Sequence, residues 1–132
     1  MNLFYLHIGF MLASMALLLA GVAVAMGFRR KRWWLKVHRR AGIGAGFVLL
    51  GGFLAAILLV SQSAGAHFAS PHTWLGGATL LGAFMTLLLG LSSFRFPGHA
   101  PEIRAIHRVS GRLTGAMGLI TVLSGLILIG VL

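Results

Sequence analysis

The sequence predicts an all-α protein: a transmembrane up-and-down four-helix bundle that forms one domain over residues 1–132. Hydrophobic residues make up 58% of the chain, charged residues make up 9%, and the mean hydropathy is +0.97. These values lie far outside those of soluble domains. No Lys, Arg, Asp or Glu occurs in residues 1–28, 41–94 or 113–132. These stretches are continuous apolar runs rather than short alternating strands, so helices are favoured over a β-barrel.

The three uncharged stretches supply four membrane spans. A bilayer core about 30 Å thick requires roughly 20 apolar helical residues. The middle stretch is long enough for two spans, separated by a polar break with Gly and Pro at residues 61–71. The predicted spans are residues 3–26, 37–60, 72–92 and 107–132. The first lacks the charged start of a secretory signal and is expected to be retained as a helix.

The basic residues predict the orientation in the membrane. All eleven lie in the first and third connections between spans, as Arg29, Arg30, Lys31, Arg32, Lys36, Arg39 and Arg40, and as Arg95, Arg104, Arg108 and Arg112. By the positive-inside rule both connections face the cytoplasm, and the N and C termini lie outside. Basic residues beside membrane helices usually meet lipid phosphates. The net charge of +10 is therefore attributed to membrane lipids as partners, and no nucleic-acid partner is predicted.

Histidine is the chemical group that remains for function. The chain has no cysteine and one carboxylate, Glu102, in a predicted loop. Thiolate metal sites, carboxylate dyads and Ser-His-Asp triads are therefore excluded, and no catalytic residue is predicted. Ionisable groups inside a membrane are costly and are functional candidates.

Four histidines stand at or near the first turn of the four apolar segments, at nearly equal intervals along the chain: His7, His38, His72 and His107. Alternate spans run in opposite directions, so the sequence places His7 and His72 at the outer face and His38 and His107 at the cytoplasmic face. Two alternatives stay open. Each imidazole could bond a carbonyl of a neighbouring helix, and His38 and His107 could anchor the interface beside their arginines.

The surroundings of the histidines favour a flat ligand. Three of them are followed four residues later, on the same helix face, by glycine: Gly42, Gly76 and Gly111. A glycine at that position leaves a slot, although close helix packing would use it equally well. Two facing imidazoles without thiolate or carboxylate suit axial ligation of haem iron better than zinc. In an up-and-down bundle each haem would bridge diagonal helices.

The predicted site therefore contains two metal centres, each an iron held by two histidines. His7 and His72 would ligate the outer haem, and His38 and His107 the cytoplasmic haem. Arginine pairs well with carboxylates, so the haem propionates of the inner site are assigned four cofactor-binding residues: Arg39, Arg40, Arg108 and Arg112.

Four segments resemble the cytochrome b561 family: LHIGFM at residues 6–11, KVH at 36–38, SPHTWLG at 70–76 and HRVSGR at 107–112. The third is the most specific, being close to the family pattern Ser-x-His-Ser-Trp-Leu-Gly. The resemblance covers nearly the whole chain and implies a four-helix core with two haem b groups, each held by two histidines. Eukaryotic members have an additional helix on each side of this core, and the sequence contains neither.

The resemblance implies transmembrane electron transfer and an oxidoreductase, with ferric reductase as one specific activity. The donor would be a cytoplasmic reductant such as ascorbate or a membrane quinol. The acceptor on the outer face would be monodehydroascorbate, a ferric chelate or a redox partner protein. By position, the resemblance assigns donor contacts to Arg29, Arg30, Lys31 and Arg32, and acceptor contacts to His67, Ser70 and Trp74.

Two other hypotheses are kept. The chain could be the haem-bearing membrane anchor of a larger redox complex, a reading that its short connections favour. It could also be a haem-free transporter with a histidine relay, although such proteins usually carry membrane carboxylates. The Gly- and Ala-rich surface would permit a homodimer.

Overall fold

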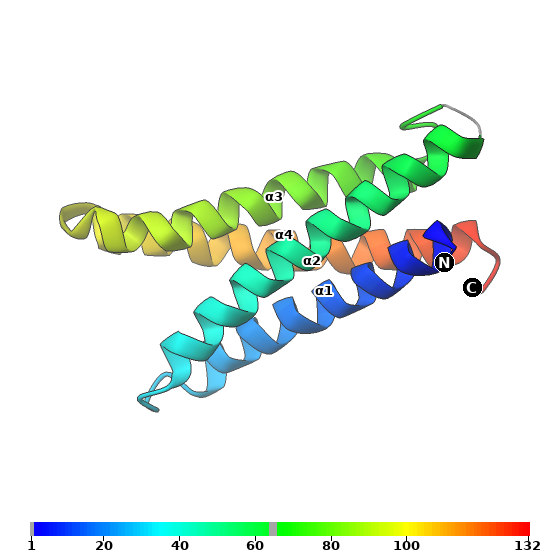
Figure 1. Cartoon of the computed structure of the whole chain (residues 1–132). Helices are drawn as coiled ribbons and strands as arrows, with labels where there is room; N and C mark the ends of the chain where they lie inside the picture. Colours follow the sequence, from blue (N-terminus) through cyan, green and yellow to red (C-terminus); the bar gives the residue numbers. More distant parts are fainter. Residues whose placement is uncertain (1, 64–65) are drawn as a thin grey trace. The chain divides into compact units, whose positions relative to one another are not determined.

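The structure is a computed structural model that describes residues 2–63 and 66–132, and it confirms the all-helical prediction (Figure 1). Its elements are α1 (Leu3–Gly27), α2 (Trp34–Ser63), α3 (Pro71–Arg95), the short 3-10 helix η1 (Pro97–His99) and α4 (Ala100–Leu128). All four α-helices are long and apolar enough to cross a membrane. The predicted break at residues 61–71 includes Ala64 and Gly65, which lie outside the described residues.

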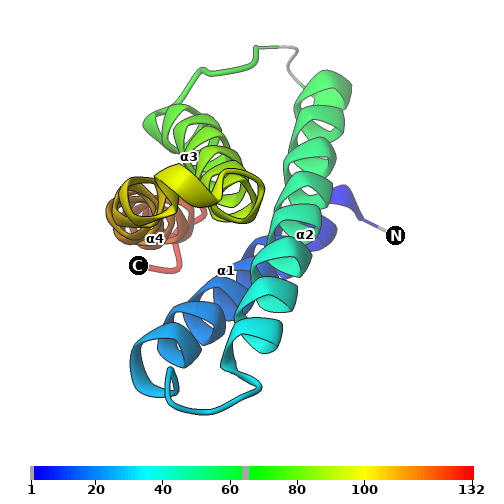
Figure 2. The ribbon, with the colours of Figure 1, turned by 90° about the vertical axis from the view of Figure 1, so that its left-hand side faces the viewer.

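The chain forms two compact units, each a hairpin of two antiparallel helices. One unit is Met1–Ala69, in which α1 packs along α2, and the other is Ser70–Leu132, in which α3 packs along α4. Figures 1 and 2 show, in two views, the two helices of each hairpin running side by side. Assembly of the hairpins into one bundle stays a prediction.

Local capping fixes where α1 and α3 begin. The Asn2 side chain accepts a hydrogen bond from the Phe4 N–H at 3.0 Å. At the start of α3, Ser70 and Thr73 form a capping box, in which each side chain bonds the other residue's backbone N–H. Such caps satisfy N–H groups that have no partner within the helix. Pro71, at the first helical position, has no N–H to satisfy.

The predicted start of the fourth helix was wrong, because α4 begins at Ala100 rather than at His107. Pro101 is compatible with a first helical turn, and the Glu102 carboxylate lies favourably at the positive end of the helix dipole. Glu102 therefore belongs to the helix and not to a loop. His107 lies inside α4, beyond its first turn, and Arg104, Arg108 and Arg112 are helical too.

The other helix ends differ by a few residues. The second helix extends the predicted span at both ends, to Trp34 and to Ser63, so Lys36, Arg39 and Arg40 are helical. In contrast, α4 ends at Leu128, before the predicted end at residue 132.

Small residues fill the interface within each hairpin. Ser14 and Gly21 of α1 are buried, as are Ala45 and Gly52 of α2. In the other hairpin the buried residues include Thr79 of α3 and Thr114, Gly118 and Thr121 of α4. Small residues let helix backbones approach closely, which is the usual packing of membrane helices.

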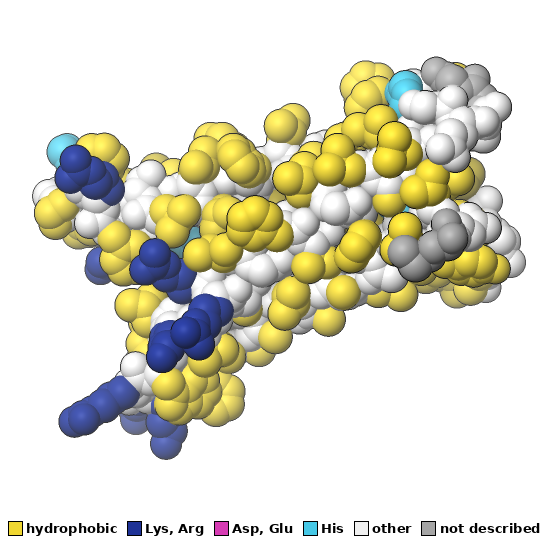
Figure 3. Space-filling model, in the orientation of Figure 1, with side chains coloured by type: hydrophobic (Ala, Val, Ile, Leu, Met, Phe, Trp, Pro, Cys, Tyr) yellow, Lys and Arg dark blue, Asp and Glu magenta, His cyan; other side chains and the backbone are white. Residues whose placement is uncertain are grey.

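Large apolar side chains lie on the outside of the helices. Phe47 is 73% exposed and Leu81 is 69% exposed. Figure 3 shows apolar side chains over most of the visible surface, while Lys and Arg gather where each hairpin turns, after α1 and after α3. An apolar surface of this extent is suited to lipid rather than to water.

Candidate functional site

Both histidines of the α1·α2 hairpin point an imidazole nitrogen at the facing helix. His7 Nδ1 lies 2.9 Å from the Gly52 carbonyl oxygen, and His38 Nδ1 lies 2.9 Å from that of Gly21. A carbonyl oxygen only accepts, so each Nδ1 carries the proton and donates it. In the neutral form of each imidazole the lone pair then lies on Nε2.

The α3·α4 hairpin repeats this arrangement. His72 Nδ1 lies 3.0 Å from the Thr121 carbonyl oxygen, and His107 Nδ1 lies 2.9 Å from that of Thr86. The Ser124 hydroxyl is also 3.2 Å from His72 Nδ1. Donation from one ring nitrogen to a backbone carbonyl is typical of histidines that bind metal through the other, because it fixes the tautomer and the orientation of the ring.

The two hairpins are structural repeats at the level of these contacts. His7 of α1 and His72 of α3 are as far apart in the sequence as Gly21 of α1 and Thr86 of α3. Likewise, His38 of α2 and His107 of α4 are as far apart in the sequence as the acceptors Gly52 and Thr121. Each imidazole–carbonyl pair of one hairpin therefore has its equivalent in the other.

The repeat also gives the two histidines of each hairpin the same separation along the helix axis. On α1, Gly21 marks the level of His38, because it accepts the His38 proton. On α3, Thr86 marks the level of His107 in the same way, and His72 precedes Thr86 by the same interval as His7 precedes Gly21. That interval is about four helical turns, or roughly 21 Å along the helix. Each hairpin thus presents two imidazoles with the same separation.

Hydroxyl groups near the histidines distinguish the two hairpins. In α1·α2 the Ser14 hydroxyl donates to the Ala45 carbonyl at 3.0 Å. The equivalent positions in α3·α4 are Thr79 and Thr114, and both belong to hydroxyl pairs: Thr79 with Thr121 at 2.9 Å, and Thr114 with Thr86 at 3.3 Å. Among the described residues, no buried side-chain polar atom is left without a partner.

The glycines predicted to leave a slot differ in their surroundings. A Cβ atom at Gly42 would meet no described atom within 4 Å. At Gly76 and Gly111 it would meet methyl groups of Thr121 and Thr86 on the facing helix, at 3.9 and 3.5 Å. Gly42 therefore has open space, whereas a methyl group at Gly76 or Gly111 would make ordinary van der Waals contact with the facing helix.

Sequence reasoning missed the residues that hold the imidazoles. These are the carbonyl acceptors Gly21, Gly52, Thr86 and Thr121, and the glycines Gly90 and Gly125, which lie against the rings of His107 and His72. No residue type marks them in the sequence, because every residue carries a backbone carbonyl and the register of one helix against the other decides which carbonyl meets an imidazole.

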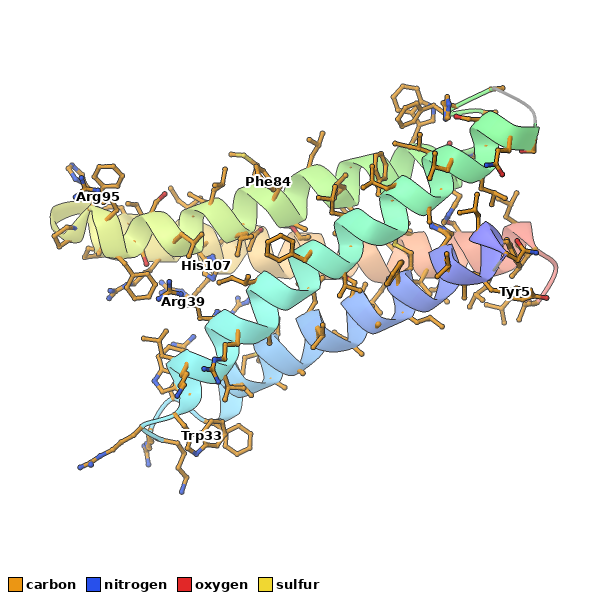
Figure 4. The ribbon with its side chains drawn as sticks, in the orientation of Figure 1. Tyr5, Trp33, Arg39, Phe84, Arg95 and His107 are labelled. Carbon is orange, nitrogen blue, oxygen red and sulfur yellow. The ribbon has the colours of Figure 1, made fainter. Side chains whose placement is uncertain are left out.

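The arginines predicted to meet propionates lie close in sequence to the inner histidines. Arg39 and Arg40 follow His38 on α2, and Arg108 and Arg112 follow His107 on α4; all four are exposed. Figure 4 shows Arg39 toward the turn end of the α1·α2 hairpin, and Arg95 at the turn end of the other.

The residues predicted to contact donor and acceptor lie at opposite ends of their hairpins. The basic residues Arg29 to Arg32 form the exposed turn after α1, where Phe28 and Trp33 pack with ring centroids 5.4 Å apart. The uncharged end holds the exposed His67, whose Nε2 is 3.2 Å from the Ser61 hydroxyl. Ser70 caps α3, and Trp74 is 64% exposed.

This donor set fits haem better than a bare ion. Over residues 2–63 and 66–132, no three His, Asp or Glu side chains gather to hold a metal ion. Haem iron needs only two axial ligands from the protein, because the macrocycle supplies the others. Each of the four histidines keeps Nε2 for such a role, because its Nδ1–H is donated to a backbone carbonyl.

Comparison with known proteins identifies the family. A family model described as eukaryotic cytochrome b561 matches residues 3–129, nearly the whole chain. No curated protein and no solved structure matches the chain. Members of the matched family are transmembrane oxidoreductases that bind haem b. The chain therefore belongs to the cytochrome b561 family of haem b proteins, which transfer electrons across a membrane.

Proposed function

We propose that the chain is a two-haem cytochrome in which each iron is held by two histidines. Electrons pass from a cytoplasmic or membrane reductant, ascorbate-like or a quinol, to an acceptor on the outer face. That acceptor is a ferric chelate, monodehydroascorbate or a redox partner protein. The observation that carries this proposal is the shared contact of the four histidines, each of which donates Nδ1–H to a backbone carbonyl.

The pairing is His7 with His72 and His38 with His107. Two haems can each take one ligand from each hairpin only if the ligands of both hairpins have the same axial separation. The equal intervals from His7 to Gly21 on α1 and from His72 to Thr86 on α3 meet this condition. An iron with two axial imidazoles is coordinatively saturated, so it supplies one-electron transfer rather than oxygen binding.

Charge supports the assignment of the two ends. Arg39, Arg40, Arg108 and Arg112 hold the propionates of the cytoplasmic haem, since guanidinium groups bond carboxylates well. The turn at Arg29 to Arg32 attracts an anionic reductant. At the uncharged end, His67, Ser70 and Trp74 line the approach of the acceptor, and Ser70 does so while capping α3.

A second function is favoured by the short connections. Only residues 28–33 separate α1 from α2, and residues 96–99 separate α3 from α4. Such turns leave little room for an elaborate substrate site, so a soluble redox partner could take the electron instead. The chain would then be the haem-bearing anchor of a larger complex.

The test is an absorption and redox study of the purified protein. We expect split b-type bands after reduction and two haems per chain. His72→Ala should remove one haem, and His107→Ala should remove the other. Absence of haem bands would refute both functions. Vesicles that hold ascorbate or a quinol analogue, with ferric chelate outside, then separate them, since only a self-sufficient reductase passes electrons without a partner protein.

A further inference from the structure

Two glycines of the α3·α4 hairpin lie directly against imidazole rings. A Cβ atom at Gly125 would lie 2.8 Å from Cε1 and 3.2 Å from Nδ1 of His72. A Cβ atom at Gly90 would lie 3.0 and 3.3 Å from the same atoms of His107. Both rings therefore occupy space that any other residue type would partly fill.

Each of these glycines follows a carbonyl acceptor by one helical turn. Thr121 accepts the proton of His72, and Gly125 stands four residues later. Thr86 and Gly90 have the same relation to His107. Residues four apart share a helix face, so each ring meets the facing helix twice, through Nδ1 at the carbonyl and through its Cε1 edge at the glycine.

The two contacts restrain different atoms of the imidazole ring. The hydrogen bond restrains the ring at Nδ1, but it tolerates a range of lengths and angles, so the ring keeps some rotation about its side-chain torsions. The small space at Cε1 limits that rotation. Since Cε1 is bonded to Nε2, the glycine determines where the lone pair of Nε2 points.

We propose that Gly125 and Gly90 are positioning residues that set the direction of the axial bonds from His72 and His107. This inference rests on the proposed function, in which both histidines ligate iron. It assigns to each glycine the tuning of one haem, because the three atoms nearest to a Cβ at Gly125 all belong to the His72 ring and those nearest to a Cβ at Gly90 all belong to the His107 ring.

The α1·α2 hairpin supplies a comparison. When the repeats are aligned on their histidines, the positions equivalent to Gly90 and Gly125 are Ala25 and Ala56. The carbonyl bonds of His38 and His7 are nevertheless 2.9 Å long. A methyl group at this position is therefore compatible with a hairpin of this design. Alanine variants at Gly90 and Gly125 should therefore fold, and the substitution should change the orientation of the imidazole ring.

Gly82 provides a matched control for crowding. A Cβ atom there would lie 2.8 Å from the Thr114 hydroxyl on α4, as close as the contact at Gly125, but against no histidine. A general loss of helix packing should therefore appear in Gly82→Ala as strongly as in the other two variants.

The experiment compares Gly125→Ala, Gly90→Ala and Gly82→Ala as purified haem-loaded proteins. The readouts are haem content, the low-spin ferric electron paramagnetic resonance signals and the midpoint potential of each haem. Gly125→Ala should shift the signal and potential of the haem that His72→Ala removes, and leave the other haem unchanged. Gly90→Ala should do the same to the haem that His107→Ala removes. Gly82→Ala should lower thermal stability with both haem signals retained.

Wild-type signals in both variants, or equal disturbance of both haems in each, would overturn the inference. Disturbance equal to that in Gly82→Ala would overturn it as well. Failure of the proposed function is a separate result, since it would appear in His72→Ala and His107→Ala as the absence of any haem-specific loss.

Discussion

At the scale of single residues, the site depends on which imidazole nitrogen carries the proton. Each of the four histidines gives its Nδ1 proton to a carbonyl on the neighbouring helix. A bond of this kind orients the ring and fixes which nitrogen can bind a metal. The alternative in which an intramembrane histidine simply bonds a helix carbonyl is thus compatible with ligation, because the two roles use different nitrogens.

Substitution of His7 tests most directly whether His7 and His72 are the ligands of the outer haem. It lacks the glycine four residues later that follows the other three histidines, yet its Nδ1 makes the same contact. We expect His7→Ala to halve the haem content of the purified protein. His67→Ala is the control, because His67 is exposed and bonded to Ser61, and it should retain both haems. The reverse result, with haem lost from His67→Ala and kept in His7→Ala, would move the outer ligand to His67.

The cap of α3 gives a second prediction for a single residue. Ser70 bonds the backbone N–H of Thr73, and loss of an N-cap side chain costs about 1 kcal/mol. Ser70→Ala should lower the free energy of unfolding by about that amount, and Ser70→Asn should restore most of it. If Ser70→Asn were no more stable than Ser70→Ala in a denaturant titration, the capping role would be refuted.

At the scale of elements, each helix pair is held together by small and hydroxyl-bearing residues. Ser14 is 1% exposed and bonds the Ala45 carbonyl across the hairpin. An interhelical hydrogen bond in a membrane protein contributes about 0.6 kcal/mol on average and up to about 1.7 kcal/mol. Ser14→Ala should therefore lower stability by about 1 kcal/mol, measured by unfolding in mixed detergents.

Ser63→Ala is the matched control for that change. Ser63 is exposed, and its hydroxyl bonds carbonyls of its own helix, those of Leu59 and Val60. Its loss should leave stability nearly unchanged. Equal destabilisation by both substitutions would mean that the interhelical bond of Ser14 contributes nothing specific.

The sequence predicted the helices well and their ends less well. Charge-free apolar runs leave helix as the outcome that satisfies backbone groups in lipid, and all four expected helices are present. The start of α4 was missed because Pro101 reads as a loop residue, although it fits a first helical turn. The acceptors Gly21 and Thr86 were missed because they depend on the register of one helix against another.

At the scale of the whole molecule, the chain repeats one design twice. Each hairpin has an uncharged end, a basic turn and two imidazoles at levels separated by the same interval. The variation between repeats is local: hydroxyls and glycines adjoin the histidines of α3·α4, whereas alanines take several equivalent positions in α1·α2. If each haem takes one ligand from each hairpin, one of its two histidines lies beside hydroxyls and glycines, and the other lies in the hairpin that has alanines at several of these positions.

Orientation in the membrane is the remaining property of the whole molecule, and the sequence makes its test simple. The chain has no cysteine, so single-cysteine variants report one position each. The basic turns should face the cytoplasm, because Lys and Arg are retained on that side. Lys31→Cys and Gly98→Cys should then react with a membrane-impermeant maleimide only after the cells are permeabilised. Ala66→Cys, in the uncharged connection, should react in intact cells. Labelling of Lys31→Cys and Gly98→Cys in intact cells, with Ala66→Cys protected, would invert the orientation and with it the faces assigned to donor and acceptor.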